Sequence, residues 1–191
     1  MLASASPRRV DLLAQISVTP ARIMAANIDE TPRPREVPTA LAKRLAFEKA
    51  TAIAAQEQDA LVLAADTVVS VGRRILPKTE TADEARACLQ LMSGRGHRVH
   101  SGICLIDGAS KNGEKKWLRV VTSRVQMRRL GAEDIAAYID SGEWQGKAGG
   151  YAIQGRAAAF ISQITGSYSN IVGLPLFETA NLLQAAGFRS R

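Results

Sequence analysis

The chain has 191 residues, 46% of them hydrophobic, which is enough to bury a sizeable core in one domain. Its net charge of +7 favours polyanionic partners such as nucleotides, nucleic acid or an acidic membrane surface, although a solvated basic surface without a partner is an equally open interpretation. Aromatic residues make up only 5% of the chain, which disfavours a protein that binds single strands by base stacking. The two cysteines lack metal-ligand spacing, which disfavours a disulfide or zinc framework and favours the reducing cytoplasm. No long apolar run is present, so neither a secretory signal nor a membrane span is expected.

The first part of the chain alternates helical and strand-like patterns. Ser6 is placed to cap a helix that has Pro7 at its first position and continues to Ile16. The segments expected next, in chain order, are a short strand at 22–26, a polar loop at 27–37, a long helix at 38–55, a buried apolar strand at 61–65, and a strand at 67–71 that pairs with 74–76 across Gly72.

The second part contains one long hairpin and further short elements. Thr81 and Glu84 form a capping box, which is typical of the start of a helix, here running to about Met92. The segments expected after it are strands at 98–106 and 116–127 joined by a loop at 107–114, a helix at 132–141, a loop at 142–150, short strands at 151–154 and 158–164, a loop at 166–173, and a helix from 175 to 187. This order predicts an α/β fold with a mixed sheet, of the α+β kind, in a single domain spanning 1–191.

The segment from Ser4 to Arg9 has the composition of an anion site. A helix N-terminus offers free N–H groups and the positive end of the helix dipole, and the guanidinium groups of Arg8 and Arg9 add forked donors suited to phosphate. The alternative is an ordinary capped helix with two solvent-facing arginines. The local sequence leaves both interpretations open.

Two acidic residues are candidates for binding a metal ion or activating water. Asp66 follows the apolar run at once, so we expect it at the C-terminal edge of a strand, where open α/β sheets bind ligands; the alternative is a turn or N-cap residue. Glu30 lies in the polar loop and is by default a solvated acid. If the two carboxylates converge, they suit Mg²⁺, which takes few carboxylates together with substrate phosphates.

Other polar residues carry weaker signals. Lys49 and Lys78 are surface lysines unless they face the same cleft as Asp66. The amide of Gln154 could read the edge of a base, or could simply lie in a turn. His97 and His100 are spaced to point to opposite faces of a strand, which argues against a shared metal.

The sequence also lacks several motifs of well-known enzyme classes. It contains no GxxxxGK[ST] loop, no GxGxxG following a strand, no GxSxG elbow and no HExxH helix.

Taken in order, several segments resemble the Maf family of nucleoside triphosphate pyrophosphatases. The matching segments are Leu2–Arg9, Asp29–Glu30, Arg44–Ala50, Ala64–Val69, Ile75–Lys78, His97–Gly102, Gly146–Gly155 and Gly166–Pro175. The resemblance implies a two-lobed fold with a deep central cleft, similar to the inosine triphosphate pyrophosphatases. It also implies hydrolysis of the α–β phosphoanhydride bond of a nucleoside triphosphate, with Mg²⁺ or Mn²⁺ as cofactor.

The resemblance further implies roles for individual residues. Asp66 is the proton acceptor, and Glu30 and Asp66 bind the metal. The residues implied in the phosphate site are Ser6, Arg8, Arg9, Lys49 and Lys78. In the family, the residue types found here at Arg8, Thr67 and Gln154 mark a dTTP/UTP-hydrolysing branch. One departure is Pro77-Lys78-Thr79, where the family usually has Gly-Lys-Pro, which leaves the reach of Lys78 open.

Several interpretations of the function remain alongside this one. The same fold could act more broadly on modified nucleotides, or the chain could be a basic nucleic-acid-binding regulator of cell division, which predicts strongly salt-dependent DNA affinity. The pyrophosphatase interpretation expects a nucleoside triphosphate as the partner, with no stable nucleic-acid or membrane complex. A homodimer is compatible with it, and the family has links to septum formation.

Overall fold

A computed structural model describes residues 1–57, 59–108 and 115–188. Within them, six strands form one mixed sheet in the order β1-β2-β4-β5-β6, with β3 paired to β2. The strands are β1 (Leu2–Ala3), β2 (Leu61–Val71), β3 (Arg74–Leu76), β4 (Gly96–Asp107), β5 (Lys115–Met127) and β6 (Ile161–Thr165). The helices are α1 (Pro7–Gln15), α2 (Pro38–Ala54), α3 (Ala82–Met92), α4 (Ala132–Asp140), the 3₁₀ helix η1 (Arg156–Phe160), α5 (Tyr168–Val172) and α6 (Leu176–Ala185).

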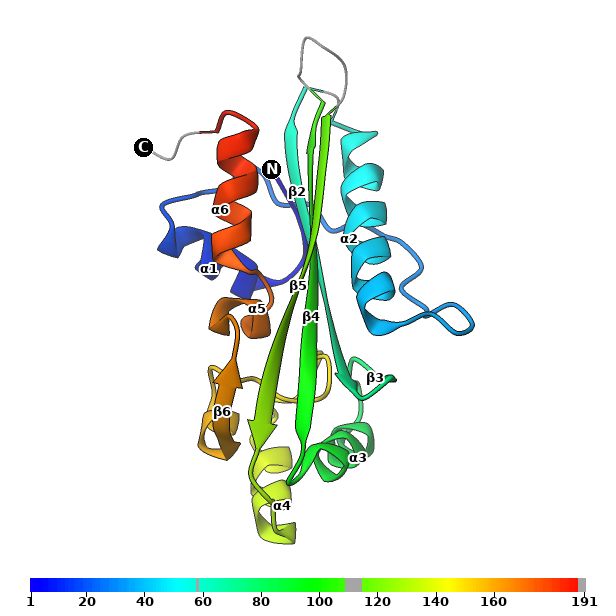
Figure 1. The fold of residues 1–191 in the computed structure, drawn as a ribbon, viewed down its shortest axis with the longest axis vertical. Coiled ribbons are helices and arrows are strands. Elements are labelled where there is room, and N and C mark those ends of the chain that lie inside the picture. Colours follow the sequence, from blue (N-terminus) through cyan, green and yellow to red (C-terminus); the bar gives the residue numbers. More distant parts are fainter. Residues whose placement is uncertain (58, 109–114, 189–191) are drawn as a thin grey trace.

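The long strands β2, β4 and β5 run along the molecule, and helices cover both faces of their upper half (Figure 1). Successive strand residues point to opposite faces. Leu63 and Leu105 therefore pack with α1 and α6, whereas Ala64 and Cys104 pack with α2. A strand buried on both faces reads as a continuous apolar run, which explains the sequence at 61–65.

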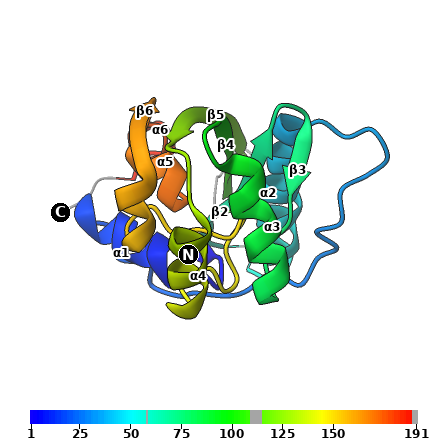
Figure 2. The same cartoon turned by 90° about the horizontal axis from the view of Figure 1, so that it is seen from below.

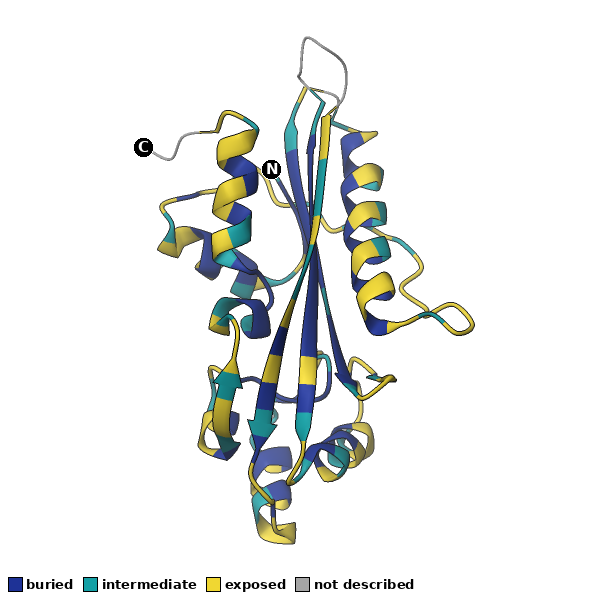
Figure 3. Cartoon of the chain, viewed as in Figure 1, coloured by how far each residue is buried: buried dark blue, intermediate teal, exposed yellow. Residues whose placement is uncertain are grey.

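Another hydrophobic cluster joins the other end of the strands to α3 and α4. These two helices lie at that end of the molecule (Figure 2). Leu89 and Met92 of α3 and Tyr138 of α4 are almost fully buried in this cluster. The long strands are buried along much of their length (Figure 3). Between the two ends, the buried residues of the sheet include polar ones, among them Asp66 and Ser101. This polar zone is where the candidate site forms.

The prediction that a strand ends at Ala65 is wrong. Strand β2 continues through Asp66 to Val71, and Asp66 is directly opposite Gly102 of β4. The strand continues because the backbone of Asp66 is paired like that of its neighbours, while its side chain is free to face a cavity. Asp66 therefore lies in the middle of a strand and not at its C-terminal edge.

Four other predictions of short elements are also wrong. The segment at 22–26 contributes only an isolated bridge from Ile23 to Leu2, because Leu2–Ala3 takes the place beside β2. The segment at 151–154 forms a turn, the one at 158–164 begins as η1 before β6, and the one at 166–173 contains the helix α5. Each of these segments is too short for hydrophobic periodicity to be informative.

The longer elements and the hairpin are confirmed. Strands β4 and β5 pair from Gly96 to Asp107, although most of the connecting loop predicted at 107–114 lies outside the described residues. The Thr81–Glu84 capping box is present. Ser6 is the N-cap of α1 as predicted, but its side chain makes no capping hydrogen bond. None of the helices in the described ranges has the length and apolar character needed to cross a bilayer.

Both histidines are buried and make polar contacts within the fold. The Nε2 atom of His97 lies 2.7 Å from the Tyr151 hydroxyl, and His100 contacts Ser70 and Thr122. His97 is almost fully buried, and burial lowers its pKa from 6.5 to about 4. The imidazole of His97 is therefore neutral in the folded protein at neutral pH.

Gly102 allows α2 to lie directly on the sheet. A Cβ atom at this position would lie 2.0 Å from the Ala42 carbonyl oxygen of α2. We expect Gly102→Ala to lower the free energy of unfolding by about 1–3 kcal/mol, because the helix backbone must move away. Urea denaturation measures the loss. Gly131→Ala is the control, since its new Cβ would meet its nearest neighbour at an ordinary 3.7 Å; equal stability of the two variants would contradict the close approach.

His97 should make stability depend on pH. Its pKa is lower in the folded chain than in the unfolded chain, so the unfolded chain binds the proton more tightly. The contribution of His97 to the free energy of unfolding is complete above about pH 6.5 and is lost as the pH falls towards 4. The total loss is on the order of 3 kcal/mol. Denaturation at a series of pH values measures this slope. His97→Gln should flatten the slope in this range, and an unchanged profile would rule out the assignment.

Candidate active site

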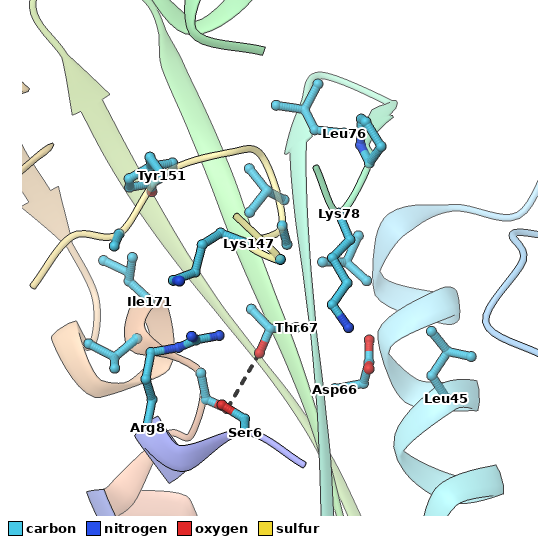
Figure 4. Close-up of a pocket in the computed structure, with 18 of the residues that line it drawn as sticks. Ser6, Arg8, Leu45, Asp66, Thr67, Leu76, Lys78, Lys147, Tyr151 and Ile171 are labelled. Atoms are coloured by element: carbon cyan, nitrogen blue, oxygen red, sulfur yellow. Dashed lines mark hydrogen bonds between the residues drawn. The ribbon is translucent and has the colours of Figure 1, made fainter. Parts of the chain in front are cut away.

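A cavity of about 260 Å³ opens beside the middle of β2 (Figure 4). Segments far apart in the sequence meet around it: the start of α1, the loop at 30–32, α2, β2, β3, the segment at 146–154 and the end of α5. Its polar and charged lining consists of Ser6, Arg8, Arg9, Glu30, Asp66, Thr67, Lys78, Lys147 and Gln154. The remaining lining is mostly aliphatic, with Tyr151 the aromatic member.

Arg9 fixes the N-terminus of α1 at the cavity. Its Nε donates to the Gly173 carbonyl at 2.9 Å and its Nη1 donates to Ser4 Oγ at 2.8 Å. Burial lowers the pKa of Arg9, and the nearby charges of Asp66 and Glu30 oppose that shift. A guanidinium stays charged under such conditions. Arg9 therefore adds a buried positive charge to the helix N-terminus, as an anion site requires.

Lys49 joins the two candidate acidic residues. Its ammonium lies 2.5 Å from Asp66 Oδ1 and 2.6 Å from Glu30 Oε1. The side chains of Lys49 and Asp66 are only 10% and 11% exposed, whereas that of Glu30 is 43% exposed. Burial raises the pKa of Glu30, but the hydrogen bond and charge of Lys49, helped by Lys78 and Arg9, hold it below its usual value. Glu30 is therefore a carboxylate at neutral pH.

The donor set fits a hard divalent cation that shares its coordination with a substrate. Within the described ranges, Asp66 Oδ2 and Glu30 Oε2 have no hydrogen-bond partner, so each carboxylate keeps one oxygen free. The described residues contain no group of three or more acidic, histidine or cysteine side chains able to enclose a metal. Two carboxylates fit Mg²⁺, which dehydrates reluctantly and commonly takes one or two carboxylates plus phosphate oxygens.

Lys78 reaches the cavity in spite of the unusual residues around it. The backbone at Lys78 pairs with Ala148 in an antiparallel bridge, and Lys78 and Asp66 lie on the same side of the cavity (Figure 4). Thr79, fully buried, donates its hydroxyl hydrogen bond to the Trp144 carbonyl at 2.8 Å. Its backbone N–H also bonds the Lys147 carbonyl at 3.1 Å. Thr79 thus ties the segment that carries Lys78 to the segment that carries Lys147.

Thr67 and Gln154 lie at different depths of the cavity. The Thr67 hydroxyl is 3.0 Å from Ser101 Oγ. Gln154 is exposed on the turn at the cavity edge.

Three glycines near Gln154 lie outside the cavity lining. A pocket for the base floored by Gly149, Gly150 and Gly155, which the sequence of this segment suggests, is not present, because none of the three lines the cavity. A Cβ on Gly149 would meet Val69, and one on Gly155 would meet Glu143, so these glycines serve close packing behind the cavity wall.

The structure brings the predicted site residues together. All of them line the cavity except Lys49, which reaches it through Asp66 and Glu30. Their roles in chemistry stay predictions. The sequence reasoning missed Lys147 and Tyr151, although both lie in the Gly146–Gly155 segment singled out by its resemblance.

These features define an α/β protein with a cationic cleft beside two carboxylates joined by a buried ammonium. The family model described as Maf-like protein matches residues 1–186, and the chain belongs to the Maf family.

Curated relatives match over nearly the whole chain. A protein named dTTP/UTP pyrophosphatase from Chelativorans sp. (strain BNC1) is 56% identical, covering 100% of this chain and 92% of the relative. Proteins of the same name from Mesorhizobium japonicum and Paramagnetospirillum magneticum are 55% and 57% identical, covering 99% and 98% of this chain and 92% and 97% of the relatives. A solved nucleoside-triphosphatase / dITP/XTP pyrophosphatase from Mycobacterium abscessus aligns over 97% of this chain and 92% of its own, but at 14% identity and a TM-score of 0.43 the likeness supports no conclusion.

Thr79 provides a test of how the cavity wall is held together. Thr79→Val keeps the shape of the side chain but leaves the Trp144 carbonyl without its hydroxyl partner. We expect a loss of about 0.5–1.5 kcal/mol in the free energy of unfolding, because one buried hydrogen bond is removed while the Trp144 carbonyl keeps its bond from the Lys147 N–H. Denaturant unfolding measures it. Thr79→Ser keeps the hydroxyl and is the control; if both variants lose the same stability, the methyl group and not the hydrogen bond is responsible.

Proposed function

We propose that this chain is a metal-dependent nucleoside triphosphate pyrophosphatase that hydrolyses dTTP and UTP to the monophosphate and pyrophosphate. The observation that carries the proposal is the pair of carboxylates, Asp66 and Glu30, held by Lys49 at one side of a cleft rich in arginine and lysine. Support for this substrate class comes from the relatives, which carry that name at more than 50% identity over nearly the whole chain.

Asp66 is the proposed proton acceptor. Its Oδ1 is engaged by Lys49, so the two lone pairs of Oδ2 remain, one to take a proton from water and one to contact a metal ion. The water oxygen then bonds to the α-phosphorus as the bond from that phosphorus to the α–β bridging oxygen breaks, and pyrophosphate leaves with the electron pair. General-base catalysis of this kind requires a carboxylate held within hydrogen-bonding reach of the water, and the Lys49 contact restricts where the Asp66 carboxylate can lie.

The cations of the cavity are proposed to hold the triphosphate. Arg9 and the N-terminus of α1 present fixed donors, and Lys78 adds an ammonium on the same side of the cleft as Asp66 (Figure 4). Such groups bring the anhydride into line and stabilise the charge that develops on the leaving group. A divalent cation held by Asp66 and Glu30 would neutralise charge on the phosphate oxygens when bound.

The test is product analysis with purified protein, Mg²⁺ or Mn²⁺ and a panel of triphosphates. The proposal expects pyrophosphate and a monophosphate as first products, with dTTP and UTP the preferred substrates. Orthophosphate and a diphosphate would overturn it. Preference for modified bases would favour the broader activity, and salt-dependent DNA binding without hydrolysis would favour the regulator. The two-lobed division of the domain, a cytoplasmic location and a homodimer stay predictions from the sequence.

We expect Asp66→Asn to remain folded, because Lys49 keeps its ion pair with Glu30 and the amide is nearly the same size. Turnover should fall by about 10²–10⁴-fold or more, because the amide cannot accept the proton. Steady-state kcat at saturating metal is the measurement. Asp11→Asn removes an exposed carboxylate from α1 and should leave kcat unchanged. Activity of the Asp66 variant within a few-fold of wild type would refute the role of Asp66.

Gln154 is proposed to contribute to the choice of base. Its amide offers a donor and an acceptor, which match two neighbouring positions on the edge of uracil or thymine. A polar group that is buried by the bound base and left unpaired costs about 1–3 kcal/mol, so CTP, whose edge is reversed, should be a poorer substrate. The ratio of kcat/KM for dTTP to that for CTP measures this preference. Gln154→Glu should change the ratio; equal ratios in the variant and the wild type would remove Gln154 from recognition.

A further inference from the structure

Charge is distributed unevenly within the cavity. On the side of Thr67 where Asp66 lies, two carboxylates accompany Lys49 and Lys78. Arg8 and Lys147 lie on the other side, where the neighbouring walls are mainly apolar (Figure 4). Within the described residues, neither Arg8 nor Lys147 forms an ion pair, and the Lys147 ammonium donates only to the Gln145 carbonyl, at 3.1 Å.

The two cations disfavour one another. Burial lowers the pKa of Lys147, the charge of Arg8 lowers it further, and Glu143 opposes the shift. Glu143 does not line the cavity, and its carboxylate accepts a hydrogen bond from the Arg156 backbone. The pKa of Arg8 is likewise lowered by burial. An acceptor oxygen of a ligand, placed between Arg8 and Lys147, would offset their repulsion. An amino group of a ligand would not bind there, because both side chains offer only hydrogen-bond donors.

The backbone at Lys147 is held in place before any ligand binds. Its carbonyl accepts hydrogen bonds from the Thr79 and Gly150 N–H groups, and the neighbouring Gly146 N–H bonds the Thr79 carbonyl. These bonds fix the start of the Lys147 side chain at the cavity wall. A side chain that starts from a fixed backbone has less freedom to lose on binding, so its contact with a ligand is worth more.

We propose that Lys147 is a further substrate-binding residue which, together with Arg8, binds an acceptor oxygen of the nucleotide on the side of Thr67 away from Asp66. This inference rests on the proposed function for the identity of the substrate. The oxygen belongs either to a phosphate group or to a ring carbonyl of the pyrimidine. Both chemistries suit a site that offers donors only, and the experiment below distinguishes them.

The experiment compares Lys147→Met with wild type by calorimetric binding and by kinetics. The probes are α,β-methylene-UTP, which cannot be cleaved at the α–β position, α,β-methylene-ATP and inorganic pyrophosphate. We expect Lys147→Met to weaken binding of the UTP analogue by about tenfold or more, as loss of a charge-assisted hydrogen bond should. KM for UTP should rise in parallel, with kcat changed much less. Lys147→Arg should restore most of the affinity.

Lys43→Met is the matched control, since it removes an exposed lysine of α2 outside the cavity and changes the net charge equally. If the oxygen is a phosphate oxygen, the Lys147→Met variant also binds pyrophosphate more weakly, and its affinities for the UTP and ATP analogues fall by the same factor. If the oxygen is a ring carbonyl, pyrophosphate binding is unchanged, and affinity for the UTP analogue falls more than affinity for the ATP analogue.

Affinity of Lys147→Met within twofold of Lys43→Met for every probe would overturn the inference. This failure is distinct from failure of the proposed function. A wild-type protein that binds the analogues but releases no pyrophosphate from UTP would refute the proposed function, and the binding result for Lys147 would still stand.

Discussion

The contact on which the site depends is the buried ammonium of Lys49 between Asp66 and Glu30. Taking charges out of water is costly, and three charged groups in one place are tolerable only because they compensate one another. The contact joins helix α2, strand β2 and the loop before α2, so each element constrains the others. It also restricts where the Asp66 carboxylate can lie. The same interaction thus links the packing of the fold to the geometry of the candidate site.

The sheet determines whether this contact can form. Lys49 can reach Asp66 because α2 lies directly on β2 and β4, and Gly102 makes that close approach possible by lacking a side chain next to Ala42. Asp66 and Gly102 are directly opposite in the strand pairing. The glycine that admits the helix and the carboxylate that meets its lysine are therefore neighbours in the sheet, and their side-by-side placement links packing to function.

Much of this arrangement could be predicted from the sequence. Long elements such as α2, α3 and the β4–β5 hairpin have strong periodicity and capping signals, and they are confirmed. Short ones were missed because a strand as brief as Leu2–Ala3 exists only through its partner. The sequence suggested that Asp66 ends its strand, because a polar residue after an apolar run is typical of the end of a buried strand, whereas Asp66 lies within the strand. Lys147 escaped notice because nothing near it in sequence shows that it faces Arg8.

The hydrogen bond from Arg9 to the Gly173 carbonyl has a consequence for biosynthesis. The two residues are separated by 164 positions, so the contact cannot exist until Gly173 has left the ribosome. Strand β1 must likewise wait for β2 before it can pair. A chain that stops before Gly173 therefore lacks the carbonyl that holds Arg9 at the cavity. Ordering of the α1 end of this cavity follows the synthesis of the segment around Gly173 and cannot precede it.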